Sequence, residues 1–228
     1  GQAYFQLGTD KKSESEKLDY YEKALDSMLS AVRTAELEEY KPKENWYVLM
    51  AACYSELSSR IGKEEALYKQ LDIYEILVNL YPKKMYFIQL GGIYGQLDRE
   101  LDYMITLNAA YQKDLLDKES EYLALTQLLL LNNNPYWAAK VLEAGRIKKV
   151  PVIDEKTKEE KILPVVKDNE KNLKLLADAW RMAQEIELAI PIMEKAARLA
   201  KDGQTFIILG SLYLSEDKLE EAVDAIEQ

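Results

Sequence analysis

Side chains that commonly catalyse reactions or bind metals are scarce in this sequence. It has no histidine, the commonest general base and a frequent metal ligand. Its single cysteine, Cys53, falls on the apolar stripe of an expected helix, where a small buried hydrophobe is favoured over a nucleophile. One cysteine can form neither an internal disulfide nor a cysteine cluster for zinc. We therefore expect no metal site and no cofactor.

Motifs for phosphate binding and carboxylate catalysis are also missing. The glycines at 91, 92 and 95 form GGIYG, which is not GxGxxG, and no GxxxxGK[ST] sequence occurs. Acidic runs such as Glu36, Glu38 and Glu39 are typical of a solvated helix face. The sequence therefore predicts a protein that is not an enzyme, and an unrecognised catalytic site is the remaining alternative.

Composition narrows the class of protein further. The 228 residues include 30 basic and 40 acidic side chains, and the formal net charge of −10 argues against a nucleic-acid partner. No run approaches the roughly 18 apolar residues that span a bilayer, so we expect no transmembrane segment. Proline and glycine are scarce, at 6 and 9 residues, while Leu, Ala, Glu, Lys and Tyr dominate, so helix is favoured over strand.

Two stretches of the chain are self-similar. FIQLGGIY (87–94) and FIILGSLY (206–213) both read as an aromatic residue, two residues, Leu-Gly, two residues and Tyr. The offsets of three, four and seven place these residues on one stripe of a helix. Small residues on such a stripe let paired helices approach closely, which explains Gly91 and Gly210.

Weaker copies of the pattern occur between and before these two. The small position of each copy is Met50, Gly91, Thr126, Ala177 or Gly210, and the separations are 41, 35, 51 and 33 residues. The separation of 41 implies helices about one turn longer in that pair, and the separation of 51 implies an insertion. One helix pair cannot bury its apolar stripe alone, whereas stacked pairs share a continuous core.

This pattern resembles the tetratricopeptide repeat, W-x2-L-G-x2-Y with an alanine nine residues later, as at Ala222. The resemblance implies an all-α fold, a right-handed superhelical solenoid of antiparallel helix pairs. We expect a single solenoid over 1–228 with about five to six helical hairpins. Residues 1–4 are expected to be the tail of a first helix and 20–37 its partner. Since Gly1 and Gln228 both fall inside repeats, we expect a fragment of a longer protein.

Residues 147–167 interrupt the helical periodicity. Two β-branched runs that contain proline, VPVI and ILPVV, flank the charged stretch DEKTKEE. The pattern is consistent with a β-hairpin, and a mobile loop is the equal alternative. If a strand forms, its edge could accept a partner.

Several stretches are similar to a narrower group, the repeat proteins that accompany TonB energy-transduction systems of Gram-negative bacteria. The resemblance implies a periplasmic scaffold with a TonB, ExbB or ExbD partner in iron uptake. The alternative is a general adaptor or assembly factor of the cell envelope or cytoplasm. The similarity covers about residues 44–228 and rests on NWYVLMAACYSEL (45–57), LYPKKMYFIQLGGIYGQL (80–97), NNNPYWAAKVLE (132–143) and NEKNLKLLADAWRMAQE (169–185).

In the tetratricopeptide family, fixed positions of the first helix of each pair line a concave groove that binds proteins or peptides. Carried onto this chain, the resemblance implies a groove lined by Tyr47, Tyr54, Gln89, Gly92, Gly95, Gln96, Gln127, Leu130, Lys171, Lys174, Asp178, Arg181, Met182 and Ser211.

Three features of this predicted groove have two interpretations each. Gly92 and Gly95 either pack tightly against a neighbouring pair or leave a bare floor for a partner's backbone. Tyr47 and Tyr54 are either recognition residues or ordinary core. The nearby cations of the fifth pair, Lys171 among them, form either a binding patch for an acidic segment or a solvated helix surface.

Overall fold

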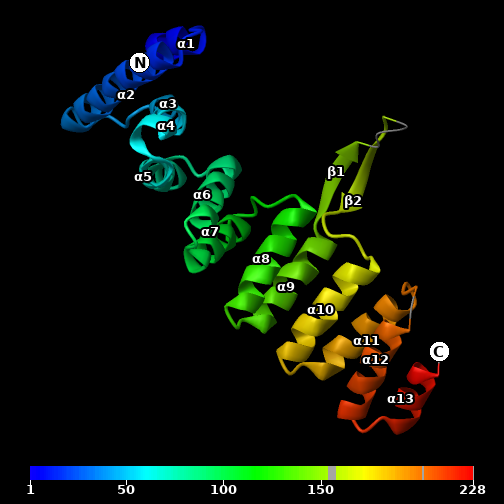
Figure 1. The fold of residues 1–228 in the computed structure, drawn as a ribbon. Coiled ribbons are helices and arrows are strands. Elements are labelled where there is room, and N and C mark those ends of the chain that lie inside the picture. Colours follow the sequence, from blue (N-terminus) through cyan, green and yellow to red (C-terminus); the bar gives the residue numbers. More distant parts are fainter. Residues whose placement is uncertain (154–157, 202, 228) are drawn as a thin grey trace. The chain divides into compact units, whose positions relative to one another are not determined.

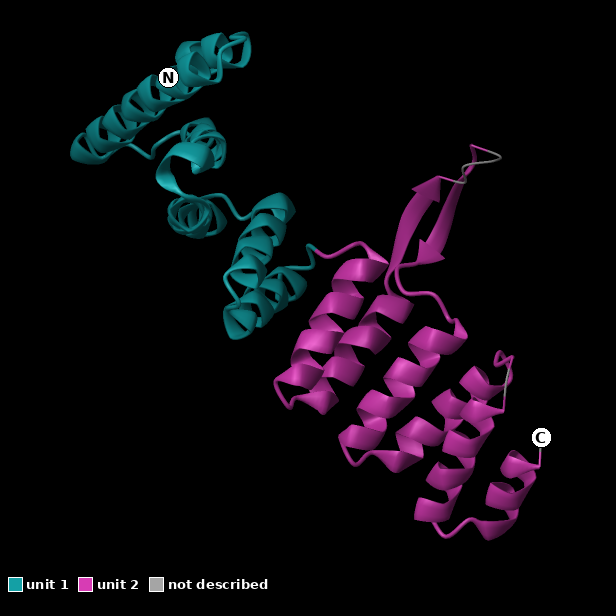
Figure 2. Ribbon diagram, in the orientation of Figure 1, with its two compact units in different colours: residues 1–115 teal, residues 116–228 magenta. Residues whose placement is uncertain are grey.

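The computed structural model describes residues 1–153, 158–201 and 203–227 (Figure 1). Within these residues, the regular structure is helical apart from one two-stranded sheet. The chain divides into two compact units, residues 1–115 and residues 116–228 (Figure 2). Each unit is a stack of antiparallel helix pairs, so the predicted fold class is confirmed. That all 228 residues form a single domain stays a prediction.

The first unit holds three helix pairs. Its second helices pack on the next first helices, α2 on α3 and α5 on α6, which joins the pairs into one stack. The pairs are α1 (Gln2–Thr9) with α2 (Glu14–Leu37), α3 (Glu44–Glu56) with α5 (Lys63–Leu80), and α6 (Lys84–Gln96) with α7 (Glu100–Gln112); the short α4 (Ser58–Ile61) lies between α3 and α5.

In the described part of the second unit, the same plan recurs with three more pairs. Here α9 packs on α10 and α11 packs on α12. The pairs are α8 (Glu119–Leu131) with α9 (Pro135–Ile147), α10 (Glu170–Met182) with α11 (Ile186–Ala197), and α12 (Gln204–Ser215) with α13 (Leu219–Ile226).

Four of the described pairs share one kind of turn between their helices. Two residues after the first helix ends, a non-glycine residue adopts a positive φ: Asp98, Asn133, Gln184 and Asp217, at 55°, 55°, 65° and 58°. The next backbone N–H donates to the carbonyl oxygen five residues earlier, at 2.9, 2.8, 2.9 and 3.0 Å. Bonds of this type satisfy carbonyl groups that a helix end leaves unpaired. The shared turn sets the second helix in the same register against the first.

A hydrogen bond between neighbouring pairs recurs in both units. In each instance an aromatic side chain of a first helix donates to a glutamate of the preceding second helix. The bonds run from Tyr94 Oη to Glu75 Oε1 (2.5 Å), from Tyr213 Oη to Glu194 Oε1 (2.6 Å) and from Trp180 Nε1 to Glu143 Oε1 (3.3 Å). We call this bond the aromatic–glutamate clamp. It places the tyrosine of the repeat pattern at the joint between pairs.

The insertion forms an antiparallel β-hairpin, so the hairpin interpretation is confirmed over the mobile loop. Strand β1 (Lys149–Ile153) pairs with β2 (Glu160–Pro164), with Pro151 opposite Ile162. Ile153 and Ile162 are 67% and 70% exposed. The charged stretch between the strands lies partly at 154–157, outside the described residues. Figure 1 shows the hairpin projecting from the end of α9.

The second apolar run of the insertion supplies both a strand and two buried side chains. Its strand ends at Pro164, and the two valines that follow, Val165 and Val166, are buried. Their backbone N–H groups donate to the carbonyl oxygens of Lys148 and Gly145, both at 2.9 Å. The valines therefore fix the hairpin base to α9.

Three expectations about helix bounds need correction. Helix α1 continues to Thr9 rather than ending at residue 4. Helix α2 begins at Glu14 rather than near residue 20, because Glu14 and Glu16 in its first turn interact favourably with the helix dipole. In the second pair, only α5 is long, at 18 residues, whereas α3 has the usual 13. The short α4 supplies the rest of the longer period.

Candidate functional site

Helix α6 presents a nearly bare face to solvent. Gln89, Gly92, Gly95 and Gln96 are all exposed along it. A Cβ atom built on Gly92 would meet nothing within 4 Å apart from its chain neighbours and the backbone of its own helix, and one on Gly95 would meet the Tyr103 ring only at ordinary contact distances from 3.6 Å. Close helix packing therefore does not explain these two glycines.

The neighbouring Gly91 behaves differently. A Cβ there would lie 2.7 Å from the Tyr103 ring of α7. The predicted close packing at the Leu-Gly glycine of the repeat is thus confirmed, and it is seen again at Gly210 against Ile226 of α13, also at 2.7 Å.

Because glycine has no side chain, the exposure of Gly92 and Gly95 is exposure of the helix backbone. The Nε2 group of Gln96 donates to the carbonyl oxygen of Gly92 at 3.3 Å. A partner's backbone could approach the two glycines closely while the amides of Gln89 and Gln96 offer donors and acceptors. We call these four residues the α6 face.

The two predicted tyrosines of α3 do not lie on an open surface. Tyr47 is only 2% exposed and belongs to a core cluster with Met50 and Leu77, so its core interpretation is correct and its side chain is withdrawn from any partner. Tyr54 is half-buried and packs against the same cluster. Burial raises the pKa of both phenols.

In the second unit, the predicted site residues divide into polar, apolar and charged groups. Gln127 of α8 and Ser211 of α12 are exposed, and Leu130 is half-buried. The Ser211 hydroxyl donates to the Ile208 carbonyl oxygen at 2.7 Å within its own helix. Met182, at the end of α10, is 45% exposed and offers apolar area.

The predicted cationic patch on α10 is largely neutralised by its own helix. Arg181 pairs with Asp178 at 3.2 Å, and Lys174 lies 4.0 Å from Glu170. Lys171 is exposed and has no ion pair within the described part of the chain. Because the carboxylates come from the same helix, the surface is mixed in charge rather than cationic.

Cys53 is fully buried in α3, as the sequence predicted for a small hydrophobe. Burial raises the pKa of its thiol to about 12, so the reactive thiolate is disfavoured. No group of three acidic or cysteine side chains in residues 1–153, 158–201 and 203–227 is arranged to hold a metal ion. None of the described helices is long and apolar enough to cross a membrane.

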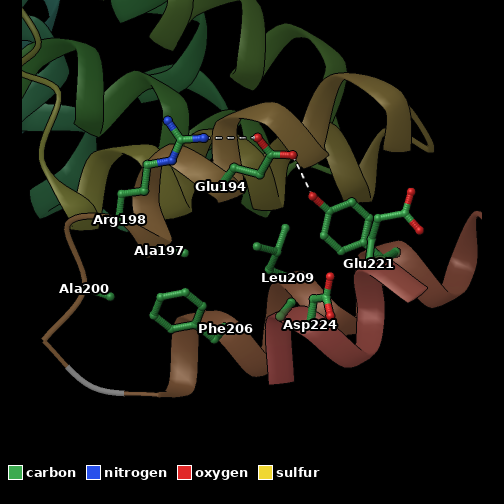
Figure 3. A pocket seen from close by; sticks show the side chains of 10 residues that line it. Glu194, Ala197, Arg198, Ala200, Phe206, Leu209, Glu221 and Asp224 are labelled. Carbon is green, nitrogen blue, oxygen red and sulfur yellow. Dashed lines mark hydrogen bonds and ion pairs between the residues drawn. The ribbon is translucent and has the colours of Figure 1, made fainter. Parts of the chain in front are cut away.

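A cavity of about 560 Å³ lies where α11, α12 and α13 meet (Figure 3). None of its lining residues was predicted from the sequence to bind a partner, although Phe206 belongs to the repeat pattern; the lining also includes Arg198, Glu221 and Asp224. The signal that could have found them is the similarity of residues 194–224 to residues 75–105 at a constant offset of 119.

Comparison with known proteins defines the fold as the tetratricopeptide type. One similar solved structure is YrrB, described as a TPR protein with an unusual peptide-binding site, at 13% identity and a TM-score of 0.53; the match covers 85% of this chain and 88% of YrrB. Another is MamA AMB-1, at 14% identity and a TM-score of 0.50, over 78% of this chain and 88% of MamA. No known family model and no curated protein matches the sequence.

Proposed function

We propose that this protein is a non-catalytic scaffold that binds a protein or peptide partner, with the α6 face as a contact surface. The observation that carries the proposal is Gly92, an exposed interior helix glycine with open space above it. An interior glycine costs roughly 1 kcal/mol relative to alanine. Since packing does not require this glycine, a partner's close approach is the better explanation.

Two further observations support a scaffold. The fold is shared with YrrB, whose description names a peptide-binding site. The sequence has no histidine, and the one thiol is buried with a pKa raised to about 12, which disfavours the reactive thiolate.

The finer proposal is that the scaffold is a periplasmic accessory of a TonB-type uptake system. It is supported by the similarity of residues 44–228 to repeat proteins of those systems. The alternative is an adaptor of the cell envelope or the cytoplasm with the same α6 face and another partner.

The test uses a photo-crosslinking amino acid at Gln96 in the native cell. We expect a specific protein adduct there, and none with the same group at the exposed Gln112 of α7. Adding Gly92→Leu should reduce the adduct at least about tenfold, because a new side chain fills the bare floor. Gln112→Leu adds the same apolar side chain elsewhere and should leave the adduct unchanged.

The identity of the adduct separates the finer proposals. TonB, ExbB or ExbD in the adduct, together with periplasmic fractionation, would support the uptake role, and another partner would support the alternative. An adduct that survives Gly92→Leu at full yield would refute the α6 face as the contact surface.

A further inference from the structure

The third and sixth helix pairs correspond residue by residue at a constant offset of 119. The same offset holds in the second helix that precedes each pair, α5 and α11. Tyr94 corresponds to Tyr213 and Glu75 to Glu194, and the clamp from Tyr94 to Glu75 recurs as the clamp from Tyr213 to Glu194. The turns also correspond, with Asp98 and Asp217 at φ of 55° and 58°. The two junctions therefore offer an internal comparison of the same backbone with different side chains.

In the third pair, this framework holds a guanidinium group. The Arg99 guanidinium carbon lies 4.7 Å from the centre of the Tyr94 ring, and its Nε donates to Asp102 Oδ2 at 2.8 Å. A cation over an aromatic face with a carboxylate beside it is a favourable arrangement for arginine. The hydrogen bond from Arg99 to Asp102 raises the pKa of the guanidinium.

In the sixth pair, the framework is present without this cation. Glu221 stands at the position of Asp102, and Lys218 stands at the position of Arg99. Lys218 is exposed, and no ion pair joins it to any residue of 1–153, 158–201 or 203–227. The ring of Tyr213 and the carboxylate of Glu221 both line the cavity at the α11–α12–α13 junction.

Smaller and more acidic residues open this cavity. The positions that are Val78 and Tyr81 in the first unit are Ala197 and Ala200 here, and Ile105 is replaced by Asp224. Figure 3 shows Asp224 and Glu221 of α13 around the same opening as Phe206 and Leu209 of α12.

The charges around the cavity favour a cation. Three carboxylates line it, those of Glu194, Glu221 and Asp224, against the single guanidinium of Arg198. Arg198 is 3.8 Å from Glu194, and its side chain is largely exposed. Glu221 and Asp224 have no ion pair within the described residues, so their charge is open to a ligand.

We propose that this cavity, the arginine seat, binds the guanidinium of an arginine side chain on a partner protein. The ring of Tyr213 would stack on the guanidinium, and Glu221 and Asp224 would accept its hydrogen bonds, as Tyr94 and Asp102 do for Arg99. The inference rests on the proposed function, because it names the chemistry of a bound partner. It uses a surface in the second unit, separate from the α6 face.

The test titrates the isotope-labelled protein with the capped peptide Gly-Arg-Gly and follows amide chemical shifts by NMR. We expect saturable shifts at α12 and α13. The matched peptide with citrulline in place of arginine, which has the same shape without the charge, should bind at least tenfold more weakly.

Two variants test the arginine seat, one by filling it with an arginine of the protein itself and one by removing its negative charge. Lys218→Arg keeps the charge and places an arginine where Arg99 stands, so the protein should fill its own seat and lose at least tenfold in affinity for the peptide. Glu221→Gln with Asp224→Asn should lose as much by removing the acceptors' charge. Glu220→Gln, on the exposed surface of the same helix, is the matched control and should bind like the wild type.

Equal binding of the arginine and citrulline peptides, or wild-type affinity in Lys218→Arg, would overturn the proposal. Lys218→Arg is an exposed and conservative change, so it stays informative even if the double variant does not fold. Gly92→Leu should leave arginine-peptide binding intact. Loss of the arginine seat alone would therefore leave the crosslink at Gln96 in place, and the two proposals can fail separately.

Discussion

At the residue scale, the space above each helix glycine decides whether helix packing requires that glycine. Gly145 of α9 is the tightest case: a Cβ there would lie 2.6 Å from Val166 and 2.7 Å from Tyr122, both buried. Gly92 is the opposite case, with nothing in reach. The same residue type thus serves close packing at one position and an open surface at another.

These two glycines predict opposite changes in stability. Gly92→Ala should raise the free energy of unfolding by about 0.5–1 kcal/mol, because alanine favours helix and meets no clash. Gly145→Ala should lower it by about 1–3 kcal/mol through overpacking. Urea unfolding followed by circular dichroism measures both. A destabilised Gly92→Ala would show that the space above α6 is filled in solution.

At the element scale, the joints between pairs depend on a few polar contacts within the apolar core. The clamp from Tyr213 to Glu194 is one example. Burial and then the Glu194 hydrogen bond raise the pKa of the Tyr213 phenol to about 12. The folded state therefore favours the protonated phenol over a range in which the unfolded chain, with a pKa of about 10, would lose the proton.

This clamp predicts a pH-dependent variant effect. Tyr213→Phe should lower the free energy of unfolding by about 1 kcal/mol at pH 7. Since a raised folded pKa contributes stability below the unfolded value, the contribution should be complete below pH 10 and lost between pH 10 and 12. Urea unfolding of both proteins across this range measures it. A constant difference up to pH 12 would contradict the assignment.

The hairpin has a base that is fixed to the helices and two strands whose outer edges pair with no other described strand. Its base is fixed by Val166 and by the ion pair of Arg146 with Asp168 at 2.6 Å, which lowers the pKa of that carboxyl. Because Val165 bonds to Lys148, the alternating ladder puts the ring nitrogens of Pro151 and Pro164 at the outer strand edges. Each edge thus lacks one N–H donor, which disfavours the predicted edge pairing with a partner strand.

Removing the strands should leave the helices intact. We expect that replacing residues 149–164 by Asn-Gly, which leaves the bonded pair Lys148 and Val165 on either side of the turn, changes the free energy of unfolding by less than about 0.5 kcal/mol, because the strands are exposed. Val166→Ala should cost about 2 kcal/mol, because Val166 is fully buried. Circular dichroism and urea unfolding compare the two. A loss of helix on strand replacement would show that the hairpin helps to hold α9 and α10.

At the scale of the whole molecule, the described residues form two stacks of three pairs each. The first stack has core clusters such as that around Leu77, and the second buries its own residues, including Leu142, Leu176 and Trp180. Each unit of roughly 115 residues is of a size that can fold alone.

The second unit should therefore fold when produced by itself. Residues 116–228 alone are expected to show a helical circular dichroism spectrum and a cooperative thermal transition. The same measurement on the full chain provides the comparison. A spectrum typical of an unfolded chain for 116–228 would show that the second unit needs the first.

Sequence alone determined the elements of this protein and the residues that recur among them. The offsets of FIQLGGIY and FIILGSLY fix one face of a helix, and local pattern suffices because helix periodicity is short-range. It also indicated the hairpin from two β-branched runs. The exact start of α2 was missed, since its first turn is polar and carries no periodic signal.

Only the tertiary structure decided which of those residues reach solvent. Tyr47 and Gly92 occupy predicted groove positions alike, yet one is in the core and the other is bare. The cavity at the sixth pair likewise depends on Ala197 and Asp224, which lie in different helices. Burial and cavities arise from contacts between elements that are distant in the chain. A repeat pattern read along one helix carries no information about those contacts.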